Sequence, residues 1–245
     1  MTSPALLAAV GEVGKGFVQE RSSDTLPCQA TDKLFCPDWA WEHLDRYGTP
    51  TVQHLELVVI SVLLGFAVAF GLALLAHRRR WLQTPLLGVT GILFTIPSIA
   101  FFFLLLPITG RGRDTAIIAL AIYTLQIIYR NTMTGLANVP ESVKDAARGM
   151  GMTDRQILWQ VELRLATPEI FAGLQIATVS TVAIATLAVF AGGGGLGKPL
   201  YEHISFGTNI VLSGGIAILM AIAFGVLLFG LQRRLTPWRR GATTI

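Results

Sequence analysis

Long uncharged stretches alternate with short polar segments along this chain. The five long stretches without Asp, Glu, Lys or Arg are Leu57–Ala76, Trp81–Gly110, Thr115–Tyr129, Ile170–Gly197 and His203–Gln232. A helix needs about 20 apolar residues to cross the ~30 Å hydrocarbon core of a membrane, and four of the stretches are long enough. The third reaches that length if Arg130 extends its side chain to the interface. The pattern predicts an all-α membrane protein with five transmembrane helices.

The basic residues between the stretches indicate the orientation. Twelve of the 19 Lys and Arg residues fall on one side of the predicted membrane: Arg78, Arg79, Arg80, Arg130, Lys144, Arg148, Arg155, Arg164, Arg233, Arg234, Arg239 and Arg240. Short cytoplasmic flanks carry such an excess. We therefore expect the N-terminus outside and the C-terminus inside, with an extracytoplasmic tail over 1–54, a transmembrane domain over 55–235 and a cytoplasmic tail over 236–245.

Composition supports this class of protein, because 52% of residues are hydrophobic and 14% charged, against about 25% charged in soluble domains. The net charge of +4 then reflects topology. We expect no nucleic-acid partner, since basic residues interleaved with aromatics are missing from the sequence.

Two cysteines, Cys28 and Cys36, lie in the predicted external tail. In an oxidising compartment they are a candidate disulfide, worth roughly 2–3 kcal/mol in the chain-entropy model. Two unpaired thiols are the alternative. No cysteine or histidine spacing predicts a metal site.

Pro97 interrupts the second stretch near its middle and removes a backbone hydrogen bond, which should break or kink the helix. Broken helices at membrane depth line a cavity or pack against protein. Pro97 and Ser98 are therefore candidates for a pathway or gate, and a packing kink is the alternative.

A cluster of glycines ends the fourth stretch: Gly192, Gly193, Gly194, Gly195 and Gly197. With Lys198 it matches phosphate-loop and dinucleotide patterns, but a membrane helix precedes it and Pro199 follows the lysine, which such sites do not allow. These glycines favour close backbone packing or a flexible turn at the outer mouth, and they are also gate candidates.

The polar loop before the fourth stretch is predicted to form two short helices. Pro140 and Glu141 suit a helix start, while Gly149 and Gly151 suit its end. Thr153, with a glutamine three residues later, predicts a capping box for the second helix. Taken alone, these features would also describe a generic surface hairpin.

This loop resembles the coupling loop of permease subunits of bacterial ABC importers, the binding-protein-dependent (MetI-like) family. The family pattern is Glu-Ala-Ala, three residues, Gly, nine residues and Ile-x-Leu-Pro. The matching positions are Asp145, Ala146, Ala147, Gly151, Val161 and Leu163. Asp145 replaces the family Glu, Val161 the Ile and Arg164 the Pro, and we expect Pro168 to end the loop one turn later.

The resemblance covers roughly residues 50–235 and is strongest to osmoprotectant permeases. The segments that carry it are Gln53–Leu55, Thr95–Ala100, Arg130–Thr132, Ala147–Met152 and Gly194–Gly197. It implies the translocation pathway of an ATP-driven importer for glycine betaine, choline, carnitine or proline, in a bacterial cell membrane. It further implies three partners: an ABC ATPase dimer, an extracytoplasmic substrate-binding protein and a second permease, identical or homologous.

The resemblance also implies that this chain is not an enzyme and holds no cofactor, since ATP and magnesium would bind the partner ATPase. A secondary transporter or channel subunit is the main alternative, although we find no inverted repeats or coupling charges in the spans. A permease for a different small solute is another.

Overall fold

In a computed structural model, the described residues are 35–202 and 206–238, and they contain helices without strands. In chain order the helices are α3 (Pro37–Glu42), 3₁₀ segment η1 (Leu44–Tyr47), α4 (Gly48–Arg78), 3₁₀ segment η2 (Arg80–Leu82), α5 (Gln83–Thr95), α6 (Ser98–Thr109), α7 (Arg113–Ala137), α8 (Glu141–Gly149), α9 (Asp154–Gln156), π-helical segment η3 (Ile157–Glu162), α10 (Leu163–Ala185), 3₁₀ segment η4 (Thr186–Ala191), α11 (Gly197–Glu202) and α12 (Gly207–Leu235).

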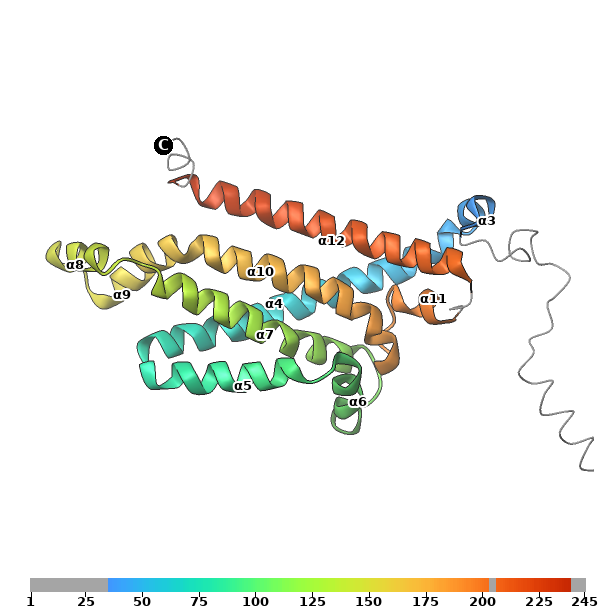
Figure 1. The fold of residues 1–245 in the computed structure, drawn as a ribbon, viewed down its shortest axis with the longest axis horizontal. Coiled ribbons are helices and arrows are strands. Elements are labelled where there is room, and N and C mark those ends of the chain that lie inside the picture. Colours follow the sequence, from blue (N-terminus) through green and yellow to red (C-terminus); the bar gives the residue numbers. More distant parts are fainter. Residues whose placement is uncertain (1–34, 203–205, 239–245) are drawn as a thin grey trace, which may run out of the picture.

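The long helices lie side by side, so that the chain passes repeatedly between two ends of the molecule (Figure 1). One end carries α8, the turn between α4 and α5, and the last turn of α12. We call it the basic end, because Arg78–Arg80, Lys144 and Arg233 belong to these segments. The opposite end carries α3 and α11. The polar segments rich in Lys and Arg thus gather at one end, as their spacing predicts.

Helix α7 forms the centre of the bundle, where it packs between α4 and α10. Small residues allow the close contact with α4: a Cβ added to Gly65 would lie 1.8 Å from Thr124 Oγ1. Gly65 is therefore a position where the neighbouring helix approaches closely. Helix α12 packs on α10 at the periphery, and only 11% of its most apolar window is buried.

Four helices in the described residues are long and apolar enough to cross a membrane: Leu44–Arg78, Arg113–Ala137, Asp154–Ala191 and Gly207–Leu235. The third predicted span is therefore a helix of 25 residues that includes Arg130, whose side chain is exposed. The second predicted span is not one straight helix. Its two parts, up to Thr95 and from Ser98, meet at an angle of 100°.

The break at Ile96 and Pro97 confirms the effect predicted for the proline. Pro97 has no backbone N–H, and Ile96 has an extended backbone with ψ 129°. The Tyr123 hydroxyl donates a hydrogen bond to the Ile96 carbonyl. A side chain of the central helix therefore satisfies a backbone group that the break leaves unpaired.

Two expectations for the polar loop are wrong. Its second helix is not short, because α9 continues through the π-helical segment into α10 as one element, Asp154–Ala191. Pro168 lies inside α10 and does not end it. Pro168 is buried in the bundle, and the Gln232 side chain of α12 donates to its carbonyl at 3.4 Å, so the proline is tolerated in a helix that packs against its neighbours.

The N-terminal tail is described only from residue 35, so Cys28 lies outside the described residues and the Cys28–Cys36 disulfide stays a prediction. Cys36 is fully buried, and its N–H donates to Thr208 Oγ1 at 3.0 Å. The Tyr47 hydroxyl donates to Asn209 Oδ1 at 2.6 Å. These bonds connect the segment before α4 to the start of α12.

Candidate functional site: a coupling loop at the basic end

Helix α8 begins and ends where its sequence predicts. Pro140 precedes Glu141, the first helical residue, and Gly149 is the last. Gly151 follows in the left-handed region, with φ +80°, which favours glycine because a Cβ would be strained there. Its N–H donates to the Arg148 carbonyl at 2.9 Å, so the chain turns sharply away from the helix end.

One face of α8 is free and the other rests on the protein. Ala147 is buried, whereas Asp145 and Ala146 are exposed. Val143 and Met150 are also exposed, and Met150 retains 75% of its accessible surface. Apolar side chains beside an acidic residue on a projecting helix are typical of a protein-docking surface.

The two halves of the coupling-loop pattern have different surroundings. Asp145, Ala146 and Gly151 lie on the exposed loop, while Val161 is half-buried in the π-helical segment. Leu163 packs in a cluster with Leu136, Leu158, Ala166 and Ile170. The second half of the pattern therefore holds the start of α10 against α7.

The predicted capping box is confirmed. Gln156 N–H donates to Thr153 Oγ1 at 3.4 Å, and Thr153 N–H donates to Gln156 Oε1 at 2.8 Å. Such reciprocal bonds satisfy donors that a helix start otherwise leaves unpaired. They define where the element Asp154–Ala191 begins.

Exposed ion pairs cover the outer surface of α8. Arg148 pairs with Asp145 at 2.7 Å and with Glu141 at 3.1 Å, and Lys144 pairs with Glu141 at 3.0 Å. Hydrogen bonds from Lys144 and Arg148 lower the pKa of the Glu141 carboxyl below its ordinary value. Bonds to Glu141 and Asp145 raise the pKa of the Arg148 guanidinium. Because Arg148, Glu141 and Asp145 are exposed, the pairs between them stabilise the helix little.

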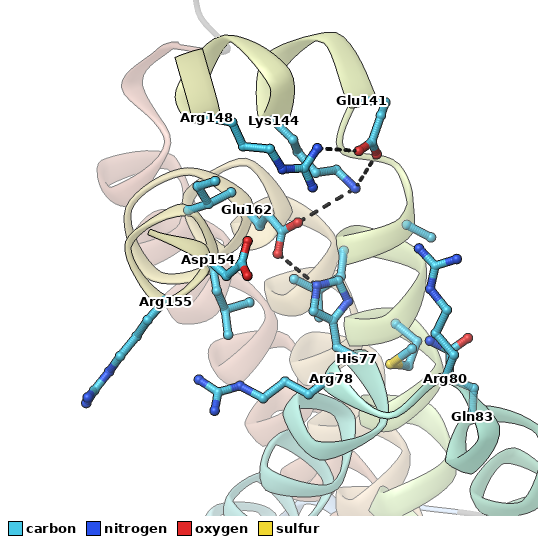
Figure 2. Close-up of a pocket in the computed structure, with 15 residues that line it drawn as sticks. His77, Arg78, Arg80, Gln83, Glu141, Lys144, Arg148, Asp154, Arg155 and Glu162 are labelled. Carbon is cyan, nitrogen blue, oxygen red and sulfur yellow. Dashed lines mark hydrogen bonds and ion pairs between the residues drawn. The ribbon is translucent and has the colours of Figure 1, made fainter. Parts of the chain in front are cut away.

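Beneath α8 lies a cavity of about 910 Å³ that is rich in charged side chains (Figure 2). Within it, the Glu162 carboxylate lies between His77 and Lys144, at 2.8 Å from His77 Nε2 and 3.7 Å from Lys144 Nζ. We call these three residues the Glu162 cluster. Arg155 points away from it.

The sequence alone does not predict this cluster, because its three residues come from separate segments of the chain and no motif connects them. One feature of the sequence does indicate a role for Glu162: it is the only charged residue in the segment Ile157–Leu163, whose other residues are apolar apart from one glutamine. An isolated carboxylate at the start of a span is costly unless it is paired, and such residues are often functional.

The glycines at the opposite end form a tight turn against α4. Gly192, Gly194 and Gly195 have positive φ. Gly195 N–H donates to Gln53 Oε1 at 3.2 Å, and Leu196 N–H donates to His54 Nδ1 at 3.3 Å. The other ring nitrogen of His54 donates to the Val182 carbonyl at 3.0 Å. His54 thus connects α4, α10 and the glycine turn.

Close backbone packing, one of the roles predicted for these glycines, is observed, while a flexible turn and a gate stay predictions. A Cβ on Gly197 would lie 1.8 Å from the Thr186 carbonyl oxygen. A 3₁₀ segment precedes the turn, so it has no resemblance in structure to a phosphate loop. An outer cavity of about 600 Å³ is lined by Gly192–Gly194, Gln53 and the ion pair between Arg113 and Glu56, 2.9 Å apart.

The two sets of gate candidates occupy neighbouring elements. Ser98 begins α6, directly after Pro97, and α6 packs against η4, which leads into the glycine turn. The Phe103 and Phe190 rings lie 6.3 Å apart across this contact. The coupling loop, by contrast, lies at the other end of the bundle.

The sequence matches a known protein family over most of its length. Residues 61–241 match the binding-protein-dependent transport system inner membrane component. An osmoprotectant import permease protein, OsmW, of Salmonella typhimurium is 41% identical over 76% of this chain and 90% of its own length. A choline transport system permease protein, OpuBB, of Bacillus subtilis is 35% identical over 76% and 87%. A carnitine transport permease protein, OpuCB, of Listeria monocytogenes is 36% identical over the same shares.

Solved structures show the same fold at lower identity. A chain of the MetNI methionine ABC transporter in an inward-facing conformation aligns with a TM-score of 0.64 at 21% identity, over 83% of this chain and 98% of that one. A chain of an amino acid ABC transporter aligns with a TM-score of 0.67 at 17% identity, over 80% and 97%. The chain therefore belongs to the family of binding-protein-dependent transport system inner membrane components, as a multi-pass permease subunit whose ATPase is a separate chain.

Proposed function

We propose that this permease forms the translocation pathway of an ATP-driven importer of a small osmoprotectant, such as glycine betaine, choline, carnitine or proline, in a bacterial inner membrane. The observation that carries the substrate class is the set of relatives, which are named for osmoprotectant, choline and carnitine transport and align over most of their length. The exposed loop at the basic end supports the importer mechanism, since it offers a separate ATPase a docking surface.

In this proposal α8 seats against an ABC ATPase dimer, which binds ATP and magnesium. Asp145, Ala146 and Gly151 lie at the contact, and Val161 and Leu163 support it from behind. Closure of the ATPase dimer moves α8, and the motion passes along α7 and α10, the helices that the loop connects. Long packed helices transmit such displacements over their whole length.

The opposite end receives substrate from an extracytoplasmic binding protein. There the break at Pro97 and Ser98 and the glycine turn, Gly192–Gly195 with Gly197, change conformation as access alternates. Their contact through α6 and η4 supports a concerted movement. A second permease, identical or homologous, completes the pathway. The apolar outer surface of α12 suits contact with lipid or with that second permease.

The test is uptake by the assembled system. The permease is coexpressed with its ATPase and binding protein in cells that lack their own osmoprotectant importers, and uptake of radiolabelled glycine betaine, choline, carnitine, proline and methionine is measured at high osmolarity. ATP-dependent uptake of one of the first four supports the proposal. Uptake of methionine alone would show a permease for another solute, and uptake without the ATPase would show a secondary transporter or channel.

A further inference from the structure

Three segments distant in the sequence contribute one residue each to the Glu162 cluster. His77 lies in the last turn of α4, Lys144 in the middle of α8, and Glu162 at the end of the π-helical segment that leads into α10. His77 and Glu162 are 85 residues apart in the chain. Figure 2 shows the carboxylate between its two partners, with one oxygen directed to each.

Glu162 is buried and its two partners are partly buried, in contrast to the pairs that Arg148 forms on the surface of the loop. The side chains of Glu162, Lys144 and His77 are 8%, 16% and 23% exposed, whereas those of Arg148, Glu141 and Asp145 are 51–65% exposed. Separating a buried ion pair leaves each charge away from water without a partner, which costs free energy. Such a pair therefore holds its two side chains in position more firmly than an exposed pair does.

The position of Glu162 at the end of a π-helical segment is the second relevant observation. Such segments are rare, and they occur often at functional sites, where they place a side chain that regular α-helix would direct elsewhere. Here the segment presents Glu162 inward while Trp159, three residues earlier, is half exposed.

The cluster gives α8 a connection that the chain does not provide. Covalently, α8 joins α7 through Pro140 and joins the element Asp154–Ala191 through residues 150–153. The contact with α4 depends on side chains, from Lys144 to Glu162 and from Glu162 to His77. Since α4 carries His54 and Gln53 against the glycine turn, it spans the distance from the coupling loop to the opposite end.

We propose that Glu162 is a positioning residue for coupling: through Lys144 and His77 it connects α8 to α4, so that displacement of α8 moves the first span together with α7 and α10. This inference rests on the proposed function, in which an ATPase moves α8. It adds a route from the loop to the Gln53 and His54 contacts with the glycine turn.

A charge exchange tests the connection. The complete transporter, with ATPase and binding protein, is reconstituted in proteoliposomes, and the substrate transported per ATP hydrolysed is measured at saturating substrate. The variants are K144E, E162K and the double variant K144E/E162K. Each single variant places like charges together, and we expect the ratio to fall about 5-fold or more, the lower range of allosteric coupling. The double variant restores opposite charges at positions 144 and 162 but leaves a cation opposite His77, so it should recover part of the ratio and not all of it.

The control is E42Q, which changes an exposed residue of α3 at the opposite end and should keep the wild-type ratio. Wild-type ratios in both single variants would overturn the inference and leave the proposed function intact. A fall that the double variant does not recover even in part would also overturn it, because positions 144 and 162 would then act separately. If the single variants do not copurify with the ATPase, the ratio in E162Q decides in the same way: a fall supports the inference and an unchanged ratio overturns it.

Failure of the proposed function has a different signature. In that case the wild-type complex itself would hydrolyse ATP without taking up an osmoprotectant, or would not bind an ATPase at all. The wild-type measurement thus separates the two outcomes before any variant is compared.

Discussion

Gly151 and Gly197 show how single residues of one type serve opposite purposes in this chain. Gly151 is needed for its backbone conformation, since φ is +80° and a Cβ would meet no atom within 4 Å. Gly197 is needed for its missing side chain, because its backbone lies against the Thr186 carbonyl. The two positions therefore predict different responses to substitution.

At Gly151, replacement by Val should uncouple ATP hydrolysis from uptake. A β-branched residue in the left-handed region costs about 1–2 kcal/mol or more, which favours another conformation of the loop after α8. Asn tolerates this region, so G151N should retain more uptake than G151V, measured as substrate transported per ATP. Equal loss in both variants would contradict a conformational role.

Asp145→Lys should uncouple ATP hydrolysis from uptake as well, because it replaces the carboxylate that pairs with Arg148 by a second cation. Unchanged uptake in this variant would count against docking at this helix.

At Gly197, replacement by Ala should lower the stability of the whole subunit. The added methyl group must displace backbone atoms of η4, and overpacking of this kind costs about 1–3 kcal/mol. We expect a lower Tm of the purified subunit in detergent. The matched control is G71A in α4, where a Cβ meets nothing within 4 Å and the Tm should not fall.

Among the elements, the broken pair α5 and α6 departs furthest from a simple span. Its proline predicts the break, but the angle of 100° depends on α7, which supplies the hydroxyl that bonds the Ile96 carbonyl. The element Asp154–Ala191 shows the reverse case, in which a helix that packs against α7 and α12 continues through Pro168. A proline alone therefore does not decide whether a membrane helix ends.

Tyr123→Phe tests the bond at the break. Without the hydroxyl, the Ile96 carbonyl loses its partner in a protein environment, which should destabilise the subunit by about 1–3 kcal/mol. Unfolding in detergent with added denaturant measures this loss. Tyr201→Phe is the control, since the Tyr201 ring contacts Phe190 and its hydroxyl forms no hydrogen bond with any of the described residues. Equal stability of the two variants would show that the bond contributes nothing.

At the scale of the whole molecule, the exposed coupling loop and the glycine turn lie at opposite ends of the bundle of long helices (Figure 1). The excess of Lys and Arg at the basic end predicts which end faces the cytoplasm. In the proposed function, this separation lets one chain contact an ATPase at one end and a binding protein at the other, with the spans as the connection.

This orientation predicts the accessibility of introduced thiols. In a background with both native cysteines replaced by serine, Met150→Cys next to α8 should react with a membrane-impermeant maleimide only in inverted membrane vesicles. Trp41→Cys in α3 should react in intact spheroplasts, because its side chain is 82% exposed at the opposite end. Labelling of both from the same side would refute the topology.

Much of this protein follows from local sequence. Charge-free stretches predict the spans because a hydrocarbon layer admits few charges, and capping residues such as Thr153 predict helix starts because they bond backbone groups next to them. The exposed half of the coupling loop, Asp145–Gly151, was likewise predictable, since its pattern is contiguous in the chain.

What only the tertiary structure decided depends on residues far apart in sequence. The continuity of α10 through Pro168, the close packing of the glycine turn on Gln53 and His54, and the Glu162 cluster each require a partner from another helix. Periodicity and composition do not report which side chains meet across a bundle, because the free energy of such a contact arises only when packing removes both groups from water.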